Sequence, residues 1–329
     1  MLYLHGIGHF HPENVITNRF LEELEIGTDE AWILERVGIR ERRTVLPLDY
    51  IRETKNQDPR AAHEASLYSN AQMAAKAARM ALDRAELQPG DIHLVISGSS
   101  APSRTTPAEA SMVAAELGID APCFDLNSAC STFGMQLDVL RRMATDQLPS
   151  FVLTVQPEGL TRTVDFRDRS VAVLFGDACS AAVTSSSEKA RISVTASNCG
   201  TNAAGCEKVT IPVAGHFRQD GHAVQGFAIR RMTESLQDLK TGLPEGCSLR
   251  FIGHQANLGA LQTVCERAGI RETQHWHNVS DFGNTGGSGA PTVLSGHWDA
   301  LGPGDRVAIC LAGAGLTWAN LLLSVEDLP

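Results

Sequence analysis

Apolar residues at helical spacing alternate along this chain with short apolar runs that are typical of strands. The predicted elements of the first half are, in chain order, a helix over Asn70–Glu86, a strand over Asp91–Ser97, a helix over Pro107–Leu117, a strand over Pro122–Leu126, a turn and helix over Asn127–Met143, and a strand over Phe151–Val155. Strands that alternate with helices are usually parallel and covered by those helices. We therefore expect an α/β protein with a parallel sheet.

The second half repeats this order of elements. Its predicted segments are a helix over Gly226–Leu239, a strand over Leu249–Gly253, a helix over Leu258–Ala268, a strand over Trp276–Ser280, a Gly-rich turn over Gly283–Gly289, a helix over Ala290–Leu301 and a strand over Asp305–Leu311. Any α/β protein alternates in this manner, but the small-residue turns at Ser128–Ser131 and Gly283–Gly289 occupy equivalent places. The repetition favours an internal duplication about a pseudo-twofold axis, with halves at residues 1–185 and 186–329.

Composition narrows the class of protein. The chain has 329 residues, 43% of them hydrophobic and 20% charged, with a net charge of −10. These values exclude collagen, coiled coil and wholesale disorder, and the acidic balance argues against nucleic acid as the main partner. Met1–Phe10 lacks the features of a signal peptide, and no run of about 18 apolar residues predicts a membrane span. None of the eight cysteines forms a C-x-x-C pair, so we expect reduced thiols, no metal site and a cytoplasmic protein.

Cys130 is the first candidate for chemistry. It lies in the segment F-D-L-N-S-A-C-S-T-F-G, where a predicted strand ends and a helix begins. A thiol at a helix N-terminus feels the positive end of the helix dipole, which favours the thiolate. Most cysteines are simply small buried hydrophobes, so position alone leaves both interpretations open.

Three further segments could complete a site around this thiol. His254 follows a predicted strand, and Asn284 lies in the second small-residue turn, at the place equivalent to Cys130. The turn Gly313–Gly315 follows the last predicted strand. Its backbone N–H groups, together with that of Cys130, could form an oxyanion hole. Each signal is weak alone, but together they place a nucleophile and hydrogen-bond donors on connections at one face of a sheet.

With these residues assembled, the chain resembles the β-ketoacyl-[acyl carrier protein] synthase III family, which has the thiolase fold. The resemblance covers nearly the whole length, and its motifs occur in order: W-I-L-E-R-V-G-I-R-E-R-R at Trp32–Arg43, the segment around Cys130, Asp168–Ser170 with Leu174–Asp177, G-H-Q-A-N at Gly253–Asn257, F-G-N-T at Phe282–Thr285, and G-A-G-L-T-W at Gly313–Trp318. The resemblance implies a duplicated, five-layered α-β-α-β-α fold and a homodimer.

The family also implies a role for each matching residue. Cys130 would take an acyl group from acyl-CoA, and His254 and Asn284 would hydrogen-bond the carbonyl of a malonyl thioester during decarboxylative Claisen condensation. The oxyanion hole would be formed by the N–H groups of Cys130 and Ala314. Coenzyme A or pantetheine would contact four residues: Trp32, Arg36, Arg169 and Asn257. No permanently bound cofactor and no metal are implied.

Two departures from the family pattern bear on the malonyl carrier. Gly226 and Gly259 stand where the family commonly has basic residues that dock the acidic carrier protein. The malonyl donor could therefore be coenzyme A, or a carrier protein met by other charges such as Arg230 and Arg231. This difference leaves two pathways open, fatty-acid initiation or a specialised pathway making a secondary metabolite, and we favour the second.

Three other functions compete with condensation. A thiolase would use a second cysteine as a base, and Cys310 lies close to the last glycine turn but one residue out of step. An acyltransferase on the same scaffold would form an ester or amide without decarboxylation, and would need a base rather than the donor pair His254 and Asn284. A catalytically silent partner subunit would not need the intact Cys-His-Asn set.

Overall fold

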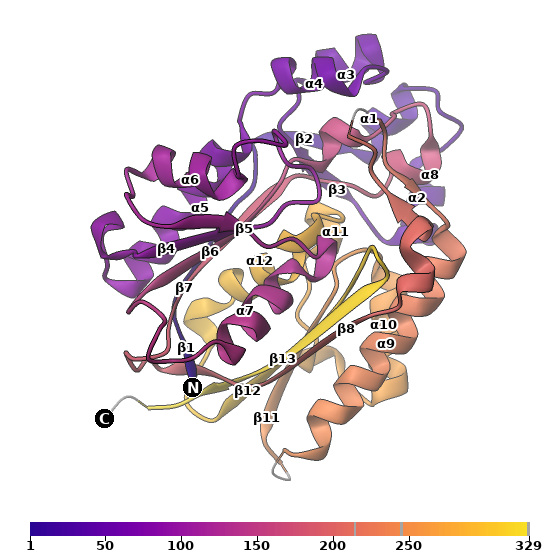
Figure 1. The fold of residues 1–329 in the computed structure, drawn as a ribbon. Helices are drawn as coiled ribbons and strands as arrows, with labels where there is room; N and C mark the ends of the chain where they lie inside the picture. The colour runs from indigo at the N-terminus through magenta and orange to yellow at the C-terminus, as the bar shows by residue number, and fades with distance from the viewer. Residues whose placement is uncertain (214, 244–245, 328–329) are drawn as a thin grey trace.

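A nine-stranded mixed sheet runs through the computed structural model, which describes residues 1–213, 215–243 and 246–327 (Figure 1). From edge to edge its strands are β11 (Ser248–Gly253), β12 (Asp305–Gly313), β13 (Thr317–Val325), β8 (Ile192–Thr201), β1 (Leu2–Phe10), β7 (Ala178–Ser185), β6 (Val152–Glu158), β4 (Leu94–Ser97) and β5 (Cys123–Asp125).

The expected parallel sheet is only partly correct. The pairs β4–β5, β4–β6 and β11–β12 are parallel, and these are the strands linked by helices. The other pairs, all of which involve β1, β7, β8 or β13, are antiparallel. Strands β12 and β13 follow each other in a hairpin, and a hairpin can only give antiparallel neighbours.

The sheet consists of two half-sheets that meet at one narrow seam. Strand β1 pairs with β7 along most of its length, but with β8 only through Leu2, Tyr3 and Leu4. Beyond the seam the two half-sheets diverge, and helices fill the space between them (Figure 1). The division of the chain into residues 1–185 and 186–329 stays a prediction.

Helices on both outer faces and in the middle make five layers. Helix α5 (Asn70–Ala85) packs on β1, β6 and β7, and α6 (Glu109–Leu117) packs on β4 and β5. Helices α7 (Thr132–Arg142) and α12 (Gly289–Gly296) each contact strands of both half-sheets. Helix α9 (Gly221–Thr241) covers β12 and β13, and α10 (Leu258–Ala268) packs on α9. The order of layers is α-β-α-β-α, as the family resemblance implies.

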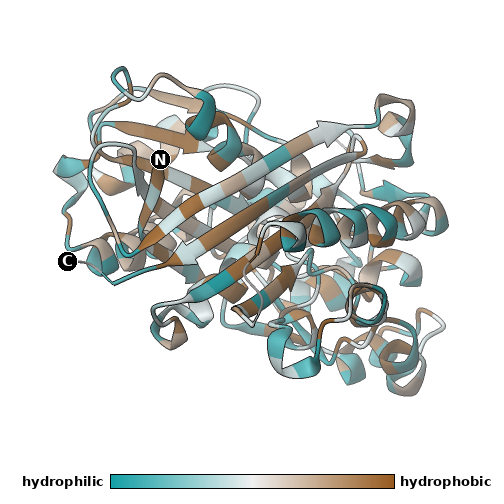
Figure 2. Ribbon diagram, turned by 90° about the horizontal axis from the view of Figure 1, so that it is seen from below, coloured by the Kyte–Doolittle hydropathy of each residue, from teal (hydrophilic) through white to brown (hydrophobic). Residues whose placement is uncertain are grey.

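Alanines and glycines bring α5 very close to the sheet. Ser69 and Gln72 form a capping box that begins this helix, and its buried face is mostly alanine. A Cβ atom at Gly8 of β1 would lie 2.1 Å from the carbonyl oxygen of Ala77. This contact leaves no room for a larger residue at Gly8. The remaining space between the helices and the sheet is filled by buried apolar side chains. Figure 2 shows mainly brown and white along the long strands, whereas the helices are banded with teal.

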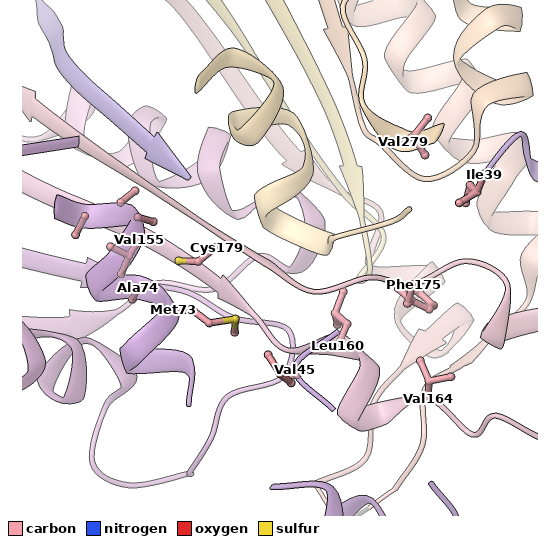
Figure 3. Close-up of a cluster of buried hydrophobic side chains, with 14 of the residues drawn as sticks. Ile39, Val45, Met73, Ala74, Val155, Leu160, Val164, Phe175, Cys179 and Val279 are labelled. Carbon is pink, nitrogen blue, oxygen red and sulfur yellow. The ribbon is translucent and has the colours of Figure 1, made fainter. Parts of the chain in front are cut away.

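The core continues from α5 to a candidate site. Figure 3 shows Met73 and Ala74 of α5 near Val155 of β6 and Cys179 of β7, and farther along the same cluster lies Phe175. These side chains are buried. Phe175 also lines the cavity described below. Core packing and cavity wall are therefore continuous, which makes the wall rigid.

Smaller elements surround these layers. They are α1 (Asn18–Glu23), α2 (Glu30–Val37), α3 (Leu48–Thr54), α4 (Pro59–Ala65), α8 (Arg169–Ala172), α11 (Val279–Phe282), the ladder of β2 (Asn14–Thr17) with β3 (Glu41–Thr44), and the ladder of β9 (Val209–Thr210) with β10 (Arg218–Gln219). Among the described residues, no helix combines the length and the apolar character needed to cross a membrane.

One predicted strand, Trp276–Ser280, is wrong. The only pairing here is an isolated bridge between His275 and Phe251, after which the chain turns into α11. The side chain of Gln255 explains the difference, because its Oε1 accepts from the N–H groups of Asn278 (3.0 Å) and Val279 (3.2 Å). These backbone donors are satisfied by a side chain rather than by a strand.

Candidate active site

A cavity of about 650 Å³ opens between the two halves of the chain. Its lining includes all eight residues that the sequence predicts for the site: Trp32, Arg36, Cys130, Arg169, His254, Asn257, Asn284 and Ala314. Its wall is mostly apolar, with polar groups converging from several elements. This is the usual character of a small-molecule site.

Cys130 lies in a 3-10 turn, η2 (Ala129–Ser131), directly before α7. Ala129 has a φ of 49°, so the chain bends sharply where the thiol is presented. Thr317 fixes this turn to the C-terminal half, because its Oγ1 lies 2.8 Å from Ser131 Oγ and 3.0 Å from the Ala314 carbonyl oxygen. The nucleophile candidate is thus held by both halves.

The thiol of Cys130 is protonated in the resting protein. Burial, and to a lesser extent the nearby carboxyl of Glu158, raise its pKa to about 12. The helix dipole was expected to favour the thiolate, but loss of hydration outweighs it here. The thiol must therefore lose its proton while it reacts, rather than before.

His254 follows β11 and faces the same cavity. Its backbone N–H donates to the Cys310 carbonyl on β12 at 3.0 Å, which fixes the residue just past the end of the strand. Burial lowers the pKa of His254 to about 4, so the imidazole is neutral at neutral pH. Its buried Nδ1 has no hydrogen-bond partner among residues 1–213, 215–243 and 246–327. With Nδ1 unprotonated, Nε2 carries the proton and can donate a hydrogen bond to a ligand.

Asn284 is oriented by its own turn. Its Oδ1 accepts from the Gly286 N–H at 3.0 Å, so the amide NH₂ remains as a donor. The backbone of Asn284 exchanges hydrogen bonds with the N-terminal half, donating to Leu174 (2.8 Å) and accepting from Gly176 (3.1 Å). Gly283 permits this approach, because it has a φ of 67° and a Cβ there would lie 2.5 Å from the Leu174 oxygen.

Two backbone N–H groups can form the predicted oxyanion hole. Ala314 lies in the hairpin between β12 and β13, and its N–H makes no hydrogen bond within the described part of the chain. Gly313 packs against the other donor, since a Cβ there would lie 3.0 Å from the Cys130 nitrogen. Without a side chain at Gly313, a ligand oxygen can approach both N–H groups.

The predicted coenzyme A contacts lie together at the mouth of the cavity. Trp32 and Arg36 are one turn apart on α2, and the Arg169 guanidinium stacks over the Trp32 ring at 4.9 Å. Both polar groups of the Asn257 side chain already make hydrogen bonds within the protein. Its Oδ1 caps α10, and its Nδ2 donates to the Arg36 carbonyl at 3.2 Å. Any contact of Asn257 with a ligand must therefore share these hydrogen-bonding groups.

The two missing docking charges leave bare surface. A Cβ at Gly226 would meet no atom within 4 Å, and one at Gly259, an exposed residue in the first turn of α10, would lie 3.3 Å from Asn257 Oδ1. Arg230 is exposed. Arg231 is engaged, because it lies over the Trp318 ring at 3.9 Å and pairs with Glu234 at 2.6 Å. Of the two alternative cations, Arg230 alone is exposed.

The sequence analysis overlooked two residues beside the site, Gln255 and Glu158, and left open whether Cys310 acts as a second catalytic cysteine. Gln255 holds the segment before α11, as described above, and Glu158 ends β6 as a fully buried carboxyl. A Glu-Gly pair at the end of an apolar strand was the available signal for Glu158. Cys310 belongs to the buried core and does not line the cavity, which removes the second cysteine that a thiolase would need.

Comparisons with known proteins identify the family of the chain. The family model described as 3-Oxoacyl-[acyl-carrier-protein (ACP)] synthase III matches residues 124–203, and the model for the C-terminal part of the same family matches residues 246–325. A curated relative, the β-ketoacyl-[acyl-carrier-protein] synthase III of Aquifex aeolicus, is 32% identical over 97% of both chains.

Solved structures of this family and of a related ketosynthase have the same fold. The crystal structure of the Aquifex aeolicus 3-oxoacyl-[acyl-carrier-protein] synthase III superposes with a TM-score of 0.87 at 29% identity, covering 98% of this chain and 100% of that one. A priming β-ketosynthase of a polyketide biosynthetic pathway superposes with a TM-score of 0.81 at 27% identity, covering 100% of this chain and 97% of that one.

The lowered pKa of His254 predicts a loss of stability in acid. Between pH 6.5 and 4 the unfolded chain binds a proton at this histidine and the folded chain does not, so the free energy of unfolding falls as the pH falls. The limiting slope is about 1.4 kcal/mol per pH unit. We expect His254→Asn to lose less melting temperature than the wild type between pH 6.5 and 4.5. His222→Asn, at an exposed position, is the control. Equal pH dependence in all three proteins would contradict the prediction.

Proposed function

This chain belongs to the 3-oxoacyl-[acyl-carrier-protein] synthase III family, and from that premise we propose that Cys130, His254 and Asn284 are its catalytic residues. The chain is a β-ketoacyl synthase III-like condensing enzyme that transfers acyl groups. The proposal assigns the steps of that reaction to named atoms. It rests chiefly on one observation, the convergence of these three side chains on one cavity.

The first step moves an acyl group to the enzyme. The Cys130 sulfur attacks the carbonyl of acyl-CoA, the carbon–sulfur bond to coenzyme A breaks, and the thiol proton leaves with the coenzyme A thiol. The oxyanion that forms in between is stabilised by the N–H groups of Cys130 and Ala314. Since burial keeps Cys130 protonated, its proton is lost during the attack rather than before it.

The second step removes CO₂ from a malonyl thioester. The bond between the carboxylate and the α-carbon breaks, and its electron pair moves toward the thioester carbonyl. His254 and Asn284 donate hydrogen bonds to that oxygen, which gains charge in the transition state. The resulting enolate carbon then attacks the acyl-Cys130 carbonyl, and the carbon–sulfur bond to Cys130 breaks to give a β-ketoacyl thioester. The Cys130 thiolate that leaves takes up a proton from water, which restores the thiol.

The Asn284 amide supports decarboxylation over ester or amide formation. Its Oδ1 is already used by Gly286, so the side chain presents a donor to the cavity and cannot readily accept a proton from an alcohol or amine. Neutral His254 can serve as a donor as well. Two donors suit an enolate oxygen, whereas an incoming nucleophile would need a base.

The mouth of the cavity supports coenzyme A as the acyl carrier. We propose that Trp32 and Arg36 bracket the adenine, with Arg169 as a second arginine beside them. The charge of Arg36 also attracts the phosphates, and Asn257 contacts the pantetheine. For the malonyl donor, the bare surface at Gly226 and Gly259 leaves coenzyme A and a carrier protein both possible, with Arg230 as the exposed cation nearby.

The setting of the reaction is also a proposal. All eight cysteines are free thiols, and the proposed nucleophile needs to remain reduced, which suits the cytoplasm. Fatty-acid initiation and a specialised pathway both use such a condensation. The specialised pathway, favoured by the missing docking charges, stays a prediction, and the preferred acyl chain would distinguish the two.

The acyl-enzyme is the first test. We expect intact-protein mass spectrometry to find an acyl adduct after incubation with a panel of acyl-CoAs, because Cys130 is the thiol that lines the cavity. Cys130→Ala should lose the adduct and Cys310→Ala, in the core, should keep it. Malonyl-CoA or a malonyl carrier protein should then discharge the adduct with release of CO₂. Discharge only by an alcohol or amine, or no adduct at all, would contradict the proposal.

Arg36 should control the affinity for acyl-CoA. We expect Arg36→Ala to raise the KM for acyl-CoA about fivefold, the size expected for one exposed charge pair, while kcat at saturation changes much less. The effect should shrink in high salt, since exposed charges are screened. Arg19→Ala is a matched control, because Arg19 is an exposed arginine outside the cavity lining. Equal KM values for both variants would argue against the phosphate contact.

We propose that a second copy covers the edge of the sheet at β5. This strand has a partner on one side only, and its Phe124 is 39% exposed. An open apolar edge strand readily pairs with another strand. We expect the protein to sediment as a dimer at micromolar concentration and Phe124→Asp to shift it toward the monomer. Leu34→Asp, at a residue 40% exposed on α2, should leave the dimer intact. A monomeric wild type would refute the proposal.

A further inference from the structure

Glu158 lies where the two halves of the active site meet. It is the last residue of β6 and is fully buried. Its Oε2 accepts from the backbone N–H of Ser100 at 3.0 Å, and its Oε1 accepts from Ser100 Oγ at 3.0 Å and from the Gly287 N–H at 2.9 Å. Ser100 follows β4 in the first half of the chain, and Gly287 follows Asn284 in the second.

The space around this carboxyl is tight on the side of the catalytic turns. Gly287 belongs to the 3-10 turn η6 (Gly286–Ser288), and a Cβ there would lie 3.1 Å from both Glu158 Oε1 and the Ala129 carbonyl oxygen. At Gly286 a Cβ would lie 2.8 Å from Glu158 Oε1. The carboxyl therefore touches the turn that carries Asn284, and that turn touches the one that carries Cys130.

We propose that Glu158 is a positioning residue, which holds the Asn284 turn against the Cys130 turn through Gly287, and that its carboxylate beside these turns slows the reaction of the Cys130 thiol. The positioning part rests on the proposed function, because it concerns the Asn284 donor. The charge part does not, since it concerns only how readily a thiol reacts.

A carboxylate is better suited to this place than an amide. The backbone N–H groups of Ser100 and Gly287 point at different oxygens of Glu158, so both oxygens must be acceptors. A glutamine has one oxygen and one NH₂ group, and its NH₂ would oppose one of the two N–H donors. Glu158→Gln thus removes the charge and one of the two anchors.

The charge on Glu158 acts on Cys130 and depends on pH. Glu158 raises the pKa of the Cys130 thiol, because a second negative charge nearby is unfavourable. Burial raises the pKa of Glu158 itself to about 7, with the carboxyl of Asp177 acting in the same direction and the three hydrogen bonds opposing it. The buried Arg162 guanidinium and the Cys179 thiol also lie within its field. Glu158 is therefore mostly ionised at pH 9 and mostly neutral below pH 6.

Glu109 supplies a matched control. It is also a buried glutamate, 1% exposed, and it accepts from the Ser103 N–H at 2.8 Å, Ser103 Oγ at 3.3 Å and Asn70 Nδ2 at 3.0 Å. Its bonds all lie within the first half of the chain, away from η2 and η6. Glu109→Gln repeats the same loss of charge and acceptor without touching either catalytic turn.

The experiment measures how fast a small methanethiosulfonate reagent modifies Cys130, read by peptide mass spectrometry. At pH 9 we expect Glu158→Gln to react about tenfold faster than the wild type, which corresponds to roughly one unit of thiol pKa. The ratio should fall toward one at pH 5.5, where the wild-type carboxyl is protonated. Glu109→Gln should match the wild type at both pH values. A Glu158→Gln rate equal to the wild type, or a ratio independent of pH, would overturn the role of the charge.

Malonyl-CoA decarboxylation tests the positioning role. We expect kcat to fall at least tenfold in Glu158→Gln and in Glu158→Asp, which keeps the charge but is too short to hold both turns. Glu158→Asp should still show a thiol reactivity near that of the wild type. Unchanged kcat in both variants would overturn the positioning role. If the wild type itself released no CO₂, the proposed function would fail, and the thiol measurement would still decide the effect of the charge.

Discussion

The close approach of two helix N-termini is the constraint on which the rest of the structure depends. Helices α7 and α12 lie between the half-sheets, and their first turns meet at the centre of the molecule. Two glycines permit this approach, because Gly287 lies against the Ala129 carbonyl and Gly313 lies against the Cys130 nitrogen. Small residues there bring the candidate nucleophile and the candidate donors to one cavity, while the large apolar residues of the core are kept behind them.

Burial at this point decides which kind of chemistry is available. Removal of water keeps the Cys130 thiol protonated and the His254 imidazole neutral, so these two groups enter the reaction as a neutral nucleophile and a neutral donor. Charge appears only when a thioester oxygen becomes negative during the reaction. Hydrogen-bond donors that are already oriented then stabilise that charge without reorganising. Asn284 illustrates the arrangement, because its own turn fixes the amide before any substrate arrives.

Charged groups are instead placed at the mouth of the cavity and on the outer surface. Arg36 and Arg169 are exposed there, where water screens them and they can attract an anionic ligand at little cost to the fold. Several charged groups are nevertheless buried, and Glu158 is one of them: its carboxyl accepts from backbone N–H groups of both halves of the chain. Such a buried acid is costly unless every acceptor is used, which is the pattern observed.

The sequence by itself predicted the main helices that cover the sheet and the strands β4, β5, β6, β11 and β12, but not the antiparallel strands β1, β7, β8 and β13. It also proposed the site residues. Helical periodicity located α5 and α10 almost to the residue, and family motifs selected Cys130, His254 and Asn284 from among many similar side chains. Tertiary structure alone decided the rest, because the relevant partners are distant in sequence. Gln255 replaced an expected strand with a turn, and burial reversed the expected ionisation of Cys130. Hydration and long-range hydrogen bonds are properties of the assembled fold, and no local pattern of residues specifies them.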